Sequence, residues 1–318
     1  MTLQRSHPIY NEVAVQDNDT VTIDVKALVK SVDDLMMNEV QSEVPVLTDA
    51  SRHIISAGGK RVRPQMLLLT YLALDGRDLE HVLPVAAAIE MVHTASVVHD
   101  DINDHGMVRR GRESVNAKWG RTFALLTGDY LFTKVYDLMA DYGAANRVVS
   151  DATTALVEGE TLQAYAVKNN DFSRDVYMRV IALKTAELFR AAGKLGAMFA
   201  DADDHTIEEM GEFGFNIGMA FQIIDDILDL TADSEQTGKT SHLDVDQGKG
   251  IASIMGDAPR DPMAAIREKA LAGDAIEKGH MLAQSFVNRA EDNLAVLPDG
   301  PAKDQLRNIG TLVLERSH

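Results

Sequence analysis

The stretch Glu90–Asp104, EMVHTASVVHDDIND, is a mainly apolar, helix-forming segment that ends in three aspartates. With 3.6 residues per helical turn, Asp100 and Asp104 lie one turn apart on one face, and Asp101 lies beside them. Like charges crowded at the end of an apolar helix are unfavourable unless a cation neutralises them, and the cluster itself contains no such cation. The stretch therefore predicts a buried helix that presents acidic groups to a cation.

A second stretch, Gly214–Asp229, repeats this arrangement with the sequence GFNIGMAFQIIDDILD. Its aspartates, Asp225, Asp226 and Asp229, again share one helical face behind an apolar run. Oxygen ligands without imidazole or thiolate favour Mg²⁺, which keeps coordination positions for water and phosphate oxygens. The alternative is a solvated surface, as acidic runs usually are. Two clusters, each behind an apolar helix, favour a magnesium site that binds a phosphate ester.

Apolar spacing along the rest of the chain is typical of helices. Aromatic residues make up only 5% of the sequence, and no alternation of period two persists long enough for a sheet. The predicted helices span about 22–42, 62–75, 79–103, 121–142, 144–169, 174–200, 204–232, 262–272, 275–296 and 301–316. We expect a polar arm at 1–20 and a Gly-rich loop at Thr237–Gly250. Residues 21–318 should form a single all-α domain of about ten or more helices.

Charge and composition narrow the function. The 318 residues include 31 Lys and Arg against 49 Asp and Glu, a net charge of −18 that disfavours a nucleic-acid binder. An anionic ligand must therefore be bound by local basic clusters or through metal ions. The lack of cysteine excludes disulfides, zinc–thiolate sites and thiol nucleophiles. The N-terminus has no signal-peptide pattern and no apolar run approaches 18 uninterrupted residues, so we expect a cytoplasmic protein.

Two polar residues lie on the same helical faces as the aspartates. His93 precedes Asp100 by seven residues, and Gln222 precedes Asp225 by three. A single helical histidine is more often a hydrogen-bonded core residue than a ligand contact. Two turns from an acidic cluster, however, His93 is also a candidate for phosphate contact, and both interpretations stay open.

Basic residues gather at two places, Gly58–Pro64 (GGKRVRP) and Arg109–Arg112 (RRGR). Guanidinium and ammonium groups beside free backbone N–H groups suit a diphosphate, although either cluster alone is more typical of a solvated turn. The spacing of a Walker loop is absent. Lys184, followed by Thr185 in the apolar run VIALKTAELF, needs an anionic partner or must extend to solvent.

Six motifs together resemble the trans-isoprenyl (polyprenyl) diphosphate synthases over about residues 50–250: GGKRVRP, EMVHTASVVHDDINDHGMVRRGRESVNAKWG, GDYLF, EGETLQ, LKTAELF and GMAFQIIDDILDLTAD. The resemblance implies the isoprenoid synthase fold, a homodimer, and head-to-tail condensation of isopentenyl diphosphate with an allylic diphosphate. In that reaction the allylic C–O bond ionises, the isopentenyl double bond attacks the carbocation, and the released diphosphate accepts a proton. The apolar product is expected to partition into membranes.

The resemblance also implies roles for individual residues. It implies three Mg²⁺ ions with Asp100, Asp104 and Asp225 as ligands, supported in the metal site by Asp101, Asp226 and Asp229. It implies that the first acidic cluster, Asp225 and Lys184 carry the catalysis. The implied allylic-diphosphate contacts are Arg109, Lys184, Thr185, Gln222 and Lys239. The implied isopentenyl-diphosphate contacts are Lys60, Arg63, His93 and Arg110. The segment GKGIAS at 248–253 departs from the usual Gly-Lys-Thr-Leu-Pro, and the N-terminal arm is unmatched.

Ala95 and Ser96, about one turn below Asp100, are small. In this family an aromatic side chain there closes the product tunnel early, so the two residues predict a product longer than about four isoprene units. The alternative is that they only permit close helix packing, which would allow a farnesyl or geranylgeranyl diphosphate synthase. We expect the helix at Arg147–Gln163 to form part of the lower wall.

Three rival functions fit the sequence less well. A class I terpene cyclase needs no isopentenyl-diphosphate site, so the GGKRVRP cluster argues against it. A non-catalytic synthase subunit is expected to lack part of an acidic cluster, and both are intact. A purely structural helical bundle would not bury a lysine opposite two groups of aspartates.

Overall fold

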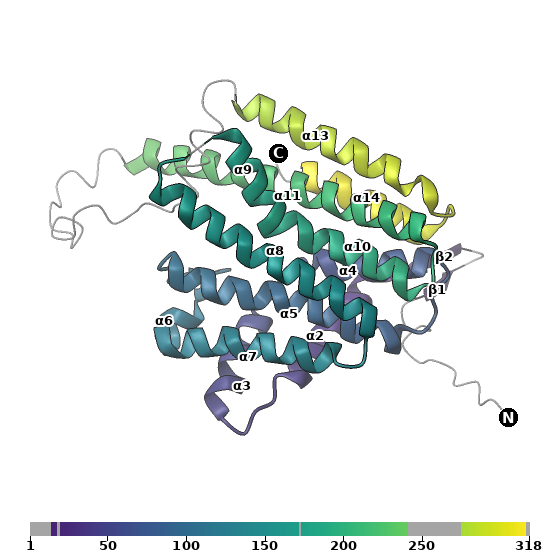
Figure 1. Cartoon of the computed structure of the whole chain (residues 1–318), viewed down its shortest axis with the longest axis horizontal. Coiled ribbons are helices and arrows are strands. Elements are labelled where there is room, and N and C mark those ends of the chain that lie inside the picture. Colours follow the sequence, from purple (N-terminus) through teal and green to yellow (C-terminus); the bar gives the residue numbers. More distant parts are fainter. Residues whose placement is uncertain (1–13, 18–19, 172, 241–274, 316–318) are drawn as a thin grey trace.

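The computed structural model describes residues 14–17, 20–171, 173–240 and 275–315, with side chains over 23–171, 173–228 and 276–315. Helices dominate these residues (Figure 1). The helices are α2 Val25–Glu39, α3 Pro45–Ser56, α4 Val62–Ala73, α5 Leu79–Asn103, α6 Val115–Trp119, α7 Arg121–Met139, α8 Gly143–Lys168, α9 Arg174–Ile181, α10 Glu187–Phe199, α11 Asp204–Thr240, α13 Ala275–Asn293 and α14 Pro301–Glu315. The sequence-based prediction of an all-α fold is confirmed.

Helix α5 is the core of the bundle. It is apolar on nearly every side, and such helices are stable only when other elements surround them. Helix α7 runs along one side of α5, and α2, α4 and α10 pack against its other sides (Figure 1). Helix α5 is long and apolar enough to cross a membrane, but 78% of its most apolar window is buried inside the bundle. The apolar side chains of α5 therefore pack mainly against other helices of the same chain.

Helices α9 and α10 are joined by a π turn, η1 (Ala182–Ala186). A π turn inserts an extra residue into the helical ladder and is frequent at functional sites. Here the turn contains Lys184 and Thr185, both singled out from the sequence. Gly159 of α8 lets α8 approach the π turn closely, since a Cβ at this position would lie 2.7 Å from the backbone nitrogen of Lys184.

Helices α10 and α11 pack with their backbones almost in contact. A Cβ at Gly193 would overlap the backbone carbonyl of Met210, and a Cβ at Gly214 would overlap that of Phe189. Both contacts exclude any larger residue unless a helix moves. This close packing fixes the position of α11, which carries the second acidic cluster.

The structure differs from the predicted elements in several places. Two antiparallel strand pairs were not expected: β1 (Ala14–Asp17) with β2 (Thr20–Ile23), and β3 (Val108–Arg109) with β4 (Arg112–Glu113). Their short length explains why no period-two signal is visible. Helix α11 continues to Thr240, so the first four residues of the predicted loop are helical. The remainder of that loop and the predicted helix at 262–272 lie outside the described residues.

Candidate active site

A cavity of about 600 Å³ lies where α4, α5, α8, η1, α11 and the β3–β4 hairpin meet. Acidic residues line it from α5 and α11, and basic residues line it from the start of α4, from the hairpin and from η1. The lining residues are Gly59, Lys60, Arg63, His93, Ser96, Val97, Asp100, Asp104, Arg109, Arg110, Gln163, Ile181, Lys184, Thr185, Phe221, Gln222 and Asp225. Twelve of them were singled out from the sequence, so the fold brings most of the predicted site together.

The basic side of the cavity is formed by Lys60, Arg63, His93 and Arg110. Arg63 is buried, and its guanidinium carbon lies 4.4 Å from the centre of the Phe189 ring. Burial lowers the pKa of Arg63 to about 10, so the group stays charged near neutral pH. Desolvation, reinforced by Arg63 and Arg110, holds the pKa of His93 well below its usual range. A neutral imidazole surrounded by cations is able to donate one hydrogen bond to an anion without adding charge.

Asp101 of the first acidic cluster does not line the cavity. It is 2% exposed, and Oδ1 accepts hydrogen bonds from Nε and Nη2 of Arg109 at 3.0 and 2.7 Å. Arg109 itself lines the cavity. Asp101 therefore orients Arg109 and supplies a counter-charge, which corrects the expectation that the cluster lacks a neutralising protein cation.

Asp100 forms a second ion pair, with Lys184 of the π turn. Lys184 Nζ lies 3.6 Å from Asp100 Oδ2 and 2.7 Å from Glu160 Oε1 of α8. Burial raises the pKa of Asp100 to about 6, an effect that Lys184 opposes and Glu160 reinforces. Burial alone would lower the pKa of Lys184, but Asp100 and Glu160 raise it above its usual value. Lys184 therefore has the anionic partner that the sequence predicts, in the form of two carboxylates, Asp100 and Glu160.

In the second acidic cluster, as in the first, one aspartate lines the cavity and its neighbour is buried behind it. Asp225 lines the cavity, whereas Asp226 is fully buried behind it. Asp226 accepts hydrogen bonds from Tyr177 Oη at 2.7 Å and from Gln222 Nε2 at 3.0 Å. Thr185 Oγ1 donates to Gln222 Oε1 at 2.8 Å, which joins the π turn to α11. This network fixes the side chain of Gln222, one turn before Asp225 and Asp226.

The cavity carboxylates fit Mg²⁺. Asp100, Asp104 and Asp225 line one cavity and supply oxygen donors without imidazole or thiolate among them. Among the described residues, no three acidic or histidine groups converge closely enough to enclose a metal ion. That is the usual arrangement for Mg²⁺, which takes one or two carboxylates and completes its shell with water and phosphate oxygens. Asp101 and Asp226 are placed as supports behind this surface rather than as ligands.

Several predicted site residues lie elsewhere. Ser96 lines the cavity, but Ala95 is fully buried and is not part of the lining. Asp100 comes five positions after Ala95, a net rotation of about 140° around the helix, so the two side chains point to different sides. Ala95 therefore does not line this cavity, and its place at the wall of the product tunnel stays a prediction. The side chains of Asp229 and Lys239 lie outside the described part of the chain.

Four residues that the sequence did not single out contribute to the site. Gln163 lines the cavity, Glu160 pairs with Lys184, and Tyr177 binds Asp226. Glu90 is 2% exposed and accepts a hydrogen bond from Arg61 Nη1 at 2.9 Å behind the basic side. Three of them had a usable signal, because Glu160 and Gln163 belong to the motif EGETLQ and Glu90 begins the motif EMVHTASVVHDDINDHGMVRRGRESVNAKWG, whereas Tyr177 lies in none of the motifs.

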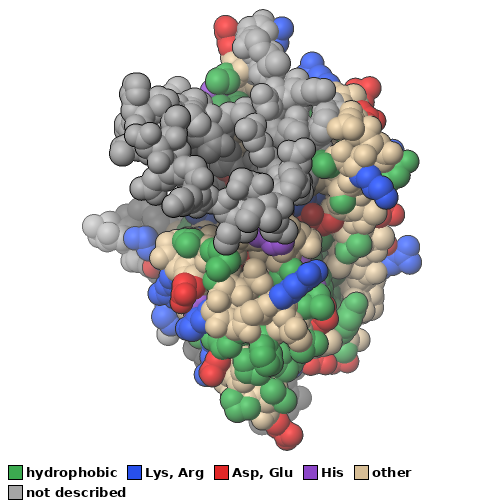
Figure 2. Space-filling model, turned by 90° about the vertical axis from the view of Figure 1, so that its left-hand side faces the viewer, with side chains coloured by type: hydrophobic (Ala, Val, Ile, Leu, Met, Phe, Trp, Pro, Cys, Tyr) green, Lys and Arg blue, Asp and Glu red, His purple; other side chains and the backbone are tan. Residues whose placement is uncertain are grey.

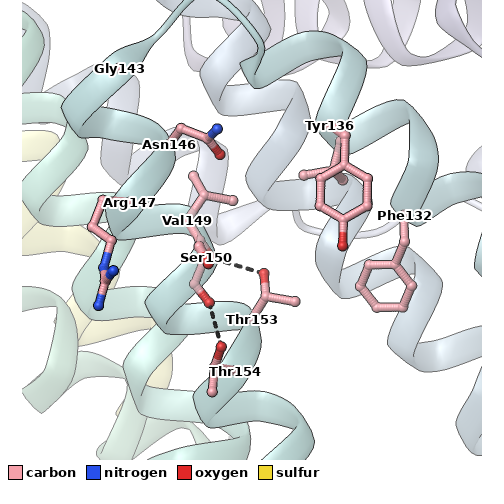
Figure 3. Close-up of a pocket in the computed structure, with 10 residues that line it drawn as sticks. Phe132, Tyr136, Gly143, Asn146, Arg147, Val149, Ser150, Thr153 and Thr154 are labelled. Atoms are coloured by element: carbon pink, nitrogen blue, oxygen red, sulfur yellow. Dashed lines mark hydrogen bonds between the residues drawn. The ribbon is translucent and has the colours of Figure 1, made fainter.

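A second pocket, of about 440 Å³, opens between α7 and α8 (Figure 3). Phe132 and Tyr136 of α7 face Asn146, Val149 and Thr153 of α8 across it. Thr153 and Thr154 hydrogen-bond to backbone carbonyls within their own helix, at 2.8 and 2.9 Å. None of the predicted substrate or metal contacts lines this pocket, although the helix predicted at Arg147–Gln163 contributes to both cavities.

Comparison with known proteins decides the family. Residues 44–269 match the family described as polyprenyl synthetase. The chain belongs to the polyprenyl synthetase family. This synthetase is 36% identical over 307 residues to heptaprenyl diphosphate synthase component 2 of Geobacillus stearothermophilus, covering 91% of this chain and 95% of the relative. It is also 36% identical over 296 residues to the short chain isoprenyl diphosphate synthase of Methanothermobacter thermautotrophicus, covering 86% and 91% of the two chains.

A solved structure agrees. The synthetase superposes on the crystal structure of heptaprenyl diphosphate synthase from Staphylococcus aureus with a TM-score of 0.79 at 26% identity, over 93% of this chain and 100% of the other. The isoprenoid synthase fold and the resemblance inferred from the six motifs are thus confirmed. The synthetase is therefore a prenyltransferase of isoprenoid biosynthesis.

Proposed function

We propose that this synthetase condenses isopentenyl diphosphate head-to-tail with an allylic diphosphate in the cavity of about 600 Å³. One observation carries the proposal: a single cavity combines a carboxylate surface with a separate cluster of four basic or imidazole side chains. Two diphosphates need two binding sites of different chemistry, one through metal ions and one through direct contacts. A terpene cyclase would need only the first.

The allylic diphosphate belongs at the carboxylate surface. Mg²⁺ bound there by Asp100, Asp104 and Asp225 supplies neutralisation of charge on the departing diphosphate. We assign three ions by the family resemblance. Lys184 and Arg109 add fixed positive charge to this side. Phe221, Ile181 and Val97 give the cavity apolar surface, which keeps water from the reacting carbon atoms.

Isopentenyl diphosphate belongs at the basic side, formed by Lys60, Arg63, His93 and Arg110. Arg63 and Arg110 provide guanidinium donors, and neutral His93 provides one further donor. The proton lost after condensation goes to the released diphosphate, since His93 lies among cations that oppose its protonation.

We propose a product longer than about four isoprene units, because the side chain of Ser96 at the cavity wall is small and leaves the space below Asp100 open. The relatives include heptaprenyl and short-chain diphosphate synthases, and the heptaprenyl synthases agree with this length. Such a product is strongly apolar and would partition into membranes, while the enzyme itself remains cytoplasmic.

We propose a homodimer formed through α7 and α8. Large apolar side chains on α7 are exposed to solvent, among them Phe123, Leu125 and Leu126 at 43, 48 and 47%. Figure 2 shows hydrophobic side chains gathered on the lower half of the end that it faces, at the height of α7 and α3 in Figure 1. Val157 and Tyr165 of α8 are exposed as well. A second copy of the chain would bury this surface.

The decisive experiment incubates the purified protein with Mg²⁺, labelled isopentenyl diphosphate and, separately, geranyl, farnesyl or geranylgeranyl diphosphate. Chromatography of the products then reports both the reaction and the chain length. We expect label in a longer prenyl diphosphate. A hydrocarbon formed from an allylic diphosphate alone would identify a cyclase, and no incorporation with any primer would contradict the proposal.

A further inference from the structure

Arg61 lies between two cavity residues, Lys60 and Arg63, but its own side chain is turned into the protein. That side chain is 2% exposed, and Arg61 is not part of the cavity lining. Its backbone is left-handed, with φ 48° and ψ 41°, at the N-terminal cap of α4. Non-glycine residues seldom adopt this conformation, so surrounding contacts must hold it. The chain therefore changes direction at Arg61, between the residues that reach the cavity.

Three contacts hold the Arg61 guanidinium. Nε donates to Asp33 Oδ1 of α2 at 2.8 Å, and Nη1 donates to Glu90 Oε1 of α5 at 2.9 Å. Nη2 donates to the backbone carbonyl of Ile55 in α3 at 2.8 Å. The donors of a planar guanidinium point in fixed directions, which a lysine ammonium cannot reproduce. Arg61 thus ties the start of α4 to three other helices.

The loop that leads into the turn at Arg61 packs against the side chain of Arg110. A Cβ at Gly59 would lie 2.5 Å from Nη1 of Arg110, so the loop backbone lies directly against this guanidinium. Burial lowers the pKa of Arg63 and of Arg110, the charge of Arg61 lowers that of Arg110 further, and the charge of Glu90, held by Arg61, opposes the lowering in both. A displacement of Arg61 would therefore affect the basic side of the cavity as a unit, without touching Asp100 or Lys184.

We propose that Arg61 is a positioning residue for isopentenyl diphosphate. Its bridge to Asp33 and Glu90 fixes the left-handed turn from which Lys60 and Arg63 reach the cavity. The inference rests on the proposed function and deepens it, because it names a residue that controls one of the two substrates without contacting it. The substrate-specific effect separates this role from a purely structural one.

The test compares two conservative variants. Arg61→Lys keeps the positive charge but loses the planar set of donors. Arg190→Lys is the matched control, since Arg190 of α10 also pairs with two carboxylates outside the cavity lining, Glu187 one turn away in its own helix and Glu212 of α11. We measure KM for each substrate, kcat, the Kd of isopentenyl diphosphate by calorimetry, and the melting temperature.

We expect Arg61→Lys to raise the KM and Kd of isopentenyl diphosphate about tenfold, the effect of weakening one charge-assisted contact. The KM of the allylic substrate and kcat should change little. Arg190→Lys should lower the melting temperature but leave both KM values unchanged. Equal increases in both KM values for Arg61→Lys, or no increase in either, would overturn the positioning role.

A second variant decides the question if Arg61→Lys does not fold. Asp33→Asn removes one charged partner at the outer edge of the bridge, where the Asp33 side chain is 34% exposed, and leaves the bond to Glu90. It should raise the KM of isopentenyl diphosphate alone, and an unchanged value would overturn the role. If the wild-type protein itself does not bind isopentenyl diphosphate, the proposed function is wrong. If the wild-type protein binds it and the variants bind it equally well, only the positioning role of Arg61 is wrong.

Discussion

Asp100 and Asp225 come from helices far apart in the sequence and line the same cavity. If both hold Mg²⁺ against the departing diphosphate, Asp100→Ala or Asp225→Ala should lower kcat by at least about a hundredfold, the scale of losing a key electrostatic stabiliser. Removal of metal with EDTA should abolish turnover, and added Mg²⁺ should restore it. Asp151→Ala, an exposed aspartate paired only with Arg147 in the described contacts, is the control. Near-normal kcat in either cavity variant would refute the metal assignment.

Arg63 and Arg109 lie on different sides of the cavity, one against Phe189 and the other against Asp101. Arg63→Ala should therefore raise the KM of isopentenyl diphosphate by about tenfold or more and change that of the allylic substrate little, as expected for losing a charged contact. Arg109→Ala should do the reverse. Steady-state kinetics with each substrate varied in turn gives both values. Equal effects on the two substrates would mean that the sites are divided incorrectly.

At the scale of the elements, the π turn η1 depends on Gly159. A methyl group there would lie 2.7 Å from the backbone nitrogen of Lys184, so Gly159→Ala must displace the turn. Because misplacement of about 1 Å can lower a rate a hundredfold, we expect kcat to fall between about tenfold and a hundredfold while the protein stays folded. Gly300→Ala is the control, since no atom lies within 4 Å of its added Cβ. Circular dichroism and kcat together check the prediction, which an unchanged kcat would contradict.

Helix α5 provides a second element-scale prediction, on product length. Ser96 lines the cavity, so Ser96→Phe should block the growing chain and shorten the main product while the first condensation continues. Ala95→Phe is the contrasting variant. Ala95 is fully buried outside the cavity lining, so the larger side chain should destabilise the fold by about 1–3 kcal/mol through overpacking. Product chromatography and thermal unfolding distinguish the two. Shorter products from Ala95→Phe alone would show that the tunnel runs on the other side of α5.

At the scale of the whole molecule, the exposed apolar face of α7 predicts a dimer. Leu126→Asp places a charge on that face and should shift the protein from dimer to monomer in sedimentation velocity. Leu312→Asp on α14 is the control, because Leu312 is similarly exposed, at 58%, on a different helix. A wild-type protein that sediments as a monomer, or a Leu126→Asp variant that remains a dimer, would exclude this interface.

Sequence reasoning recovered what depends on local periodicity. The helical faces of Asp100, Asp104 and Asp225, and the need of Lys184 for an anionic partner, follow from spacing and polarity alone. It could not recover contacts made between distant segments, because these depend on how helices pack. Arg61 carries the same signal as Arg63 in GGKRVRP, yet a left-handed backbone turns it away from the cavity.

The π turn and the Ala95 orientation mark a second limit. A helical pattern over 174–200 does not show where an extra residue enters the ladder, since the apolar spacing changes only slightly there. For Ala95, proximity in sequence to Asp100 suggested proximity in space, whereas rotation about α5 separates them. The short β3–β4 pair is set by one tight turn and leaves no periodic trace.

Helix α5 contributes side chains to both of the proposed substrate sites. His93, Ser96 and Asp100 share one face of α5 and Asp104 caps its C-terminus on the same side, so about 16 Å along the helix axis, at 1.5 Å per residue, covers both proposed diphosphate sites and the cavity wall at Ser96. Substitutions along this face can change product length during evolution without altering the distance between the two substrates. An insertion or deletion of one residue between His93 and Asp100 would instead rotate one substrate site by about 100° relative to the other. Divergence among relatives at these positions should therefore proceed by replacement of side chains, with the number of residues held constant.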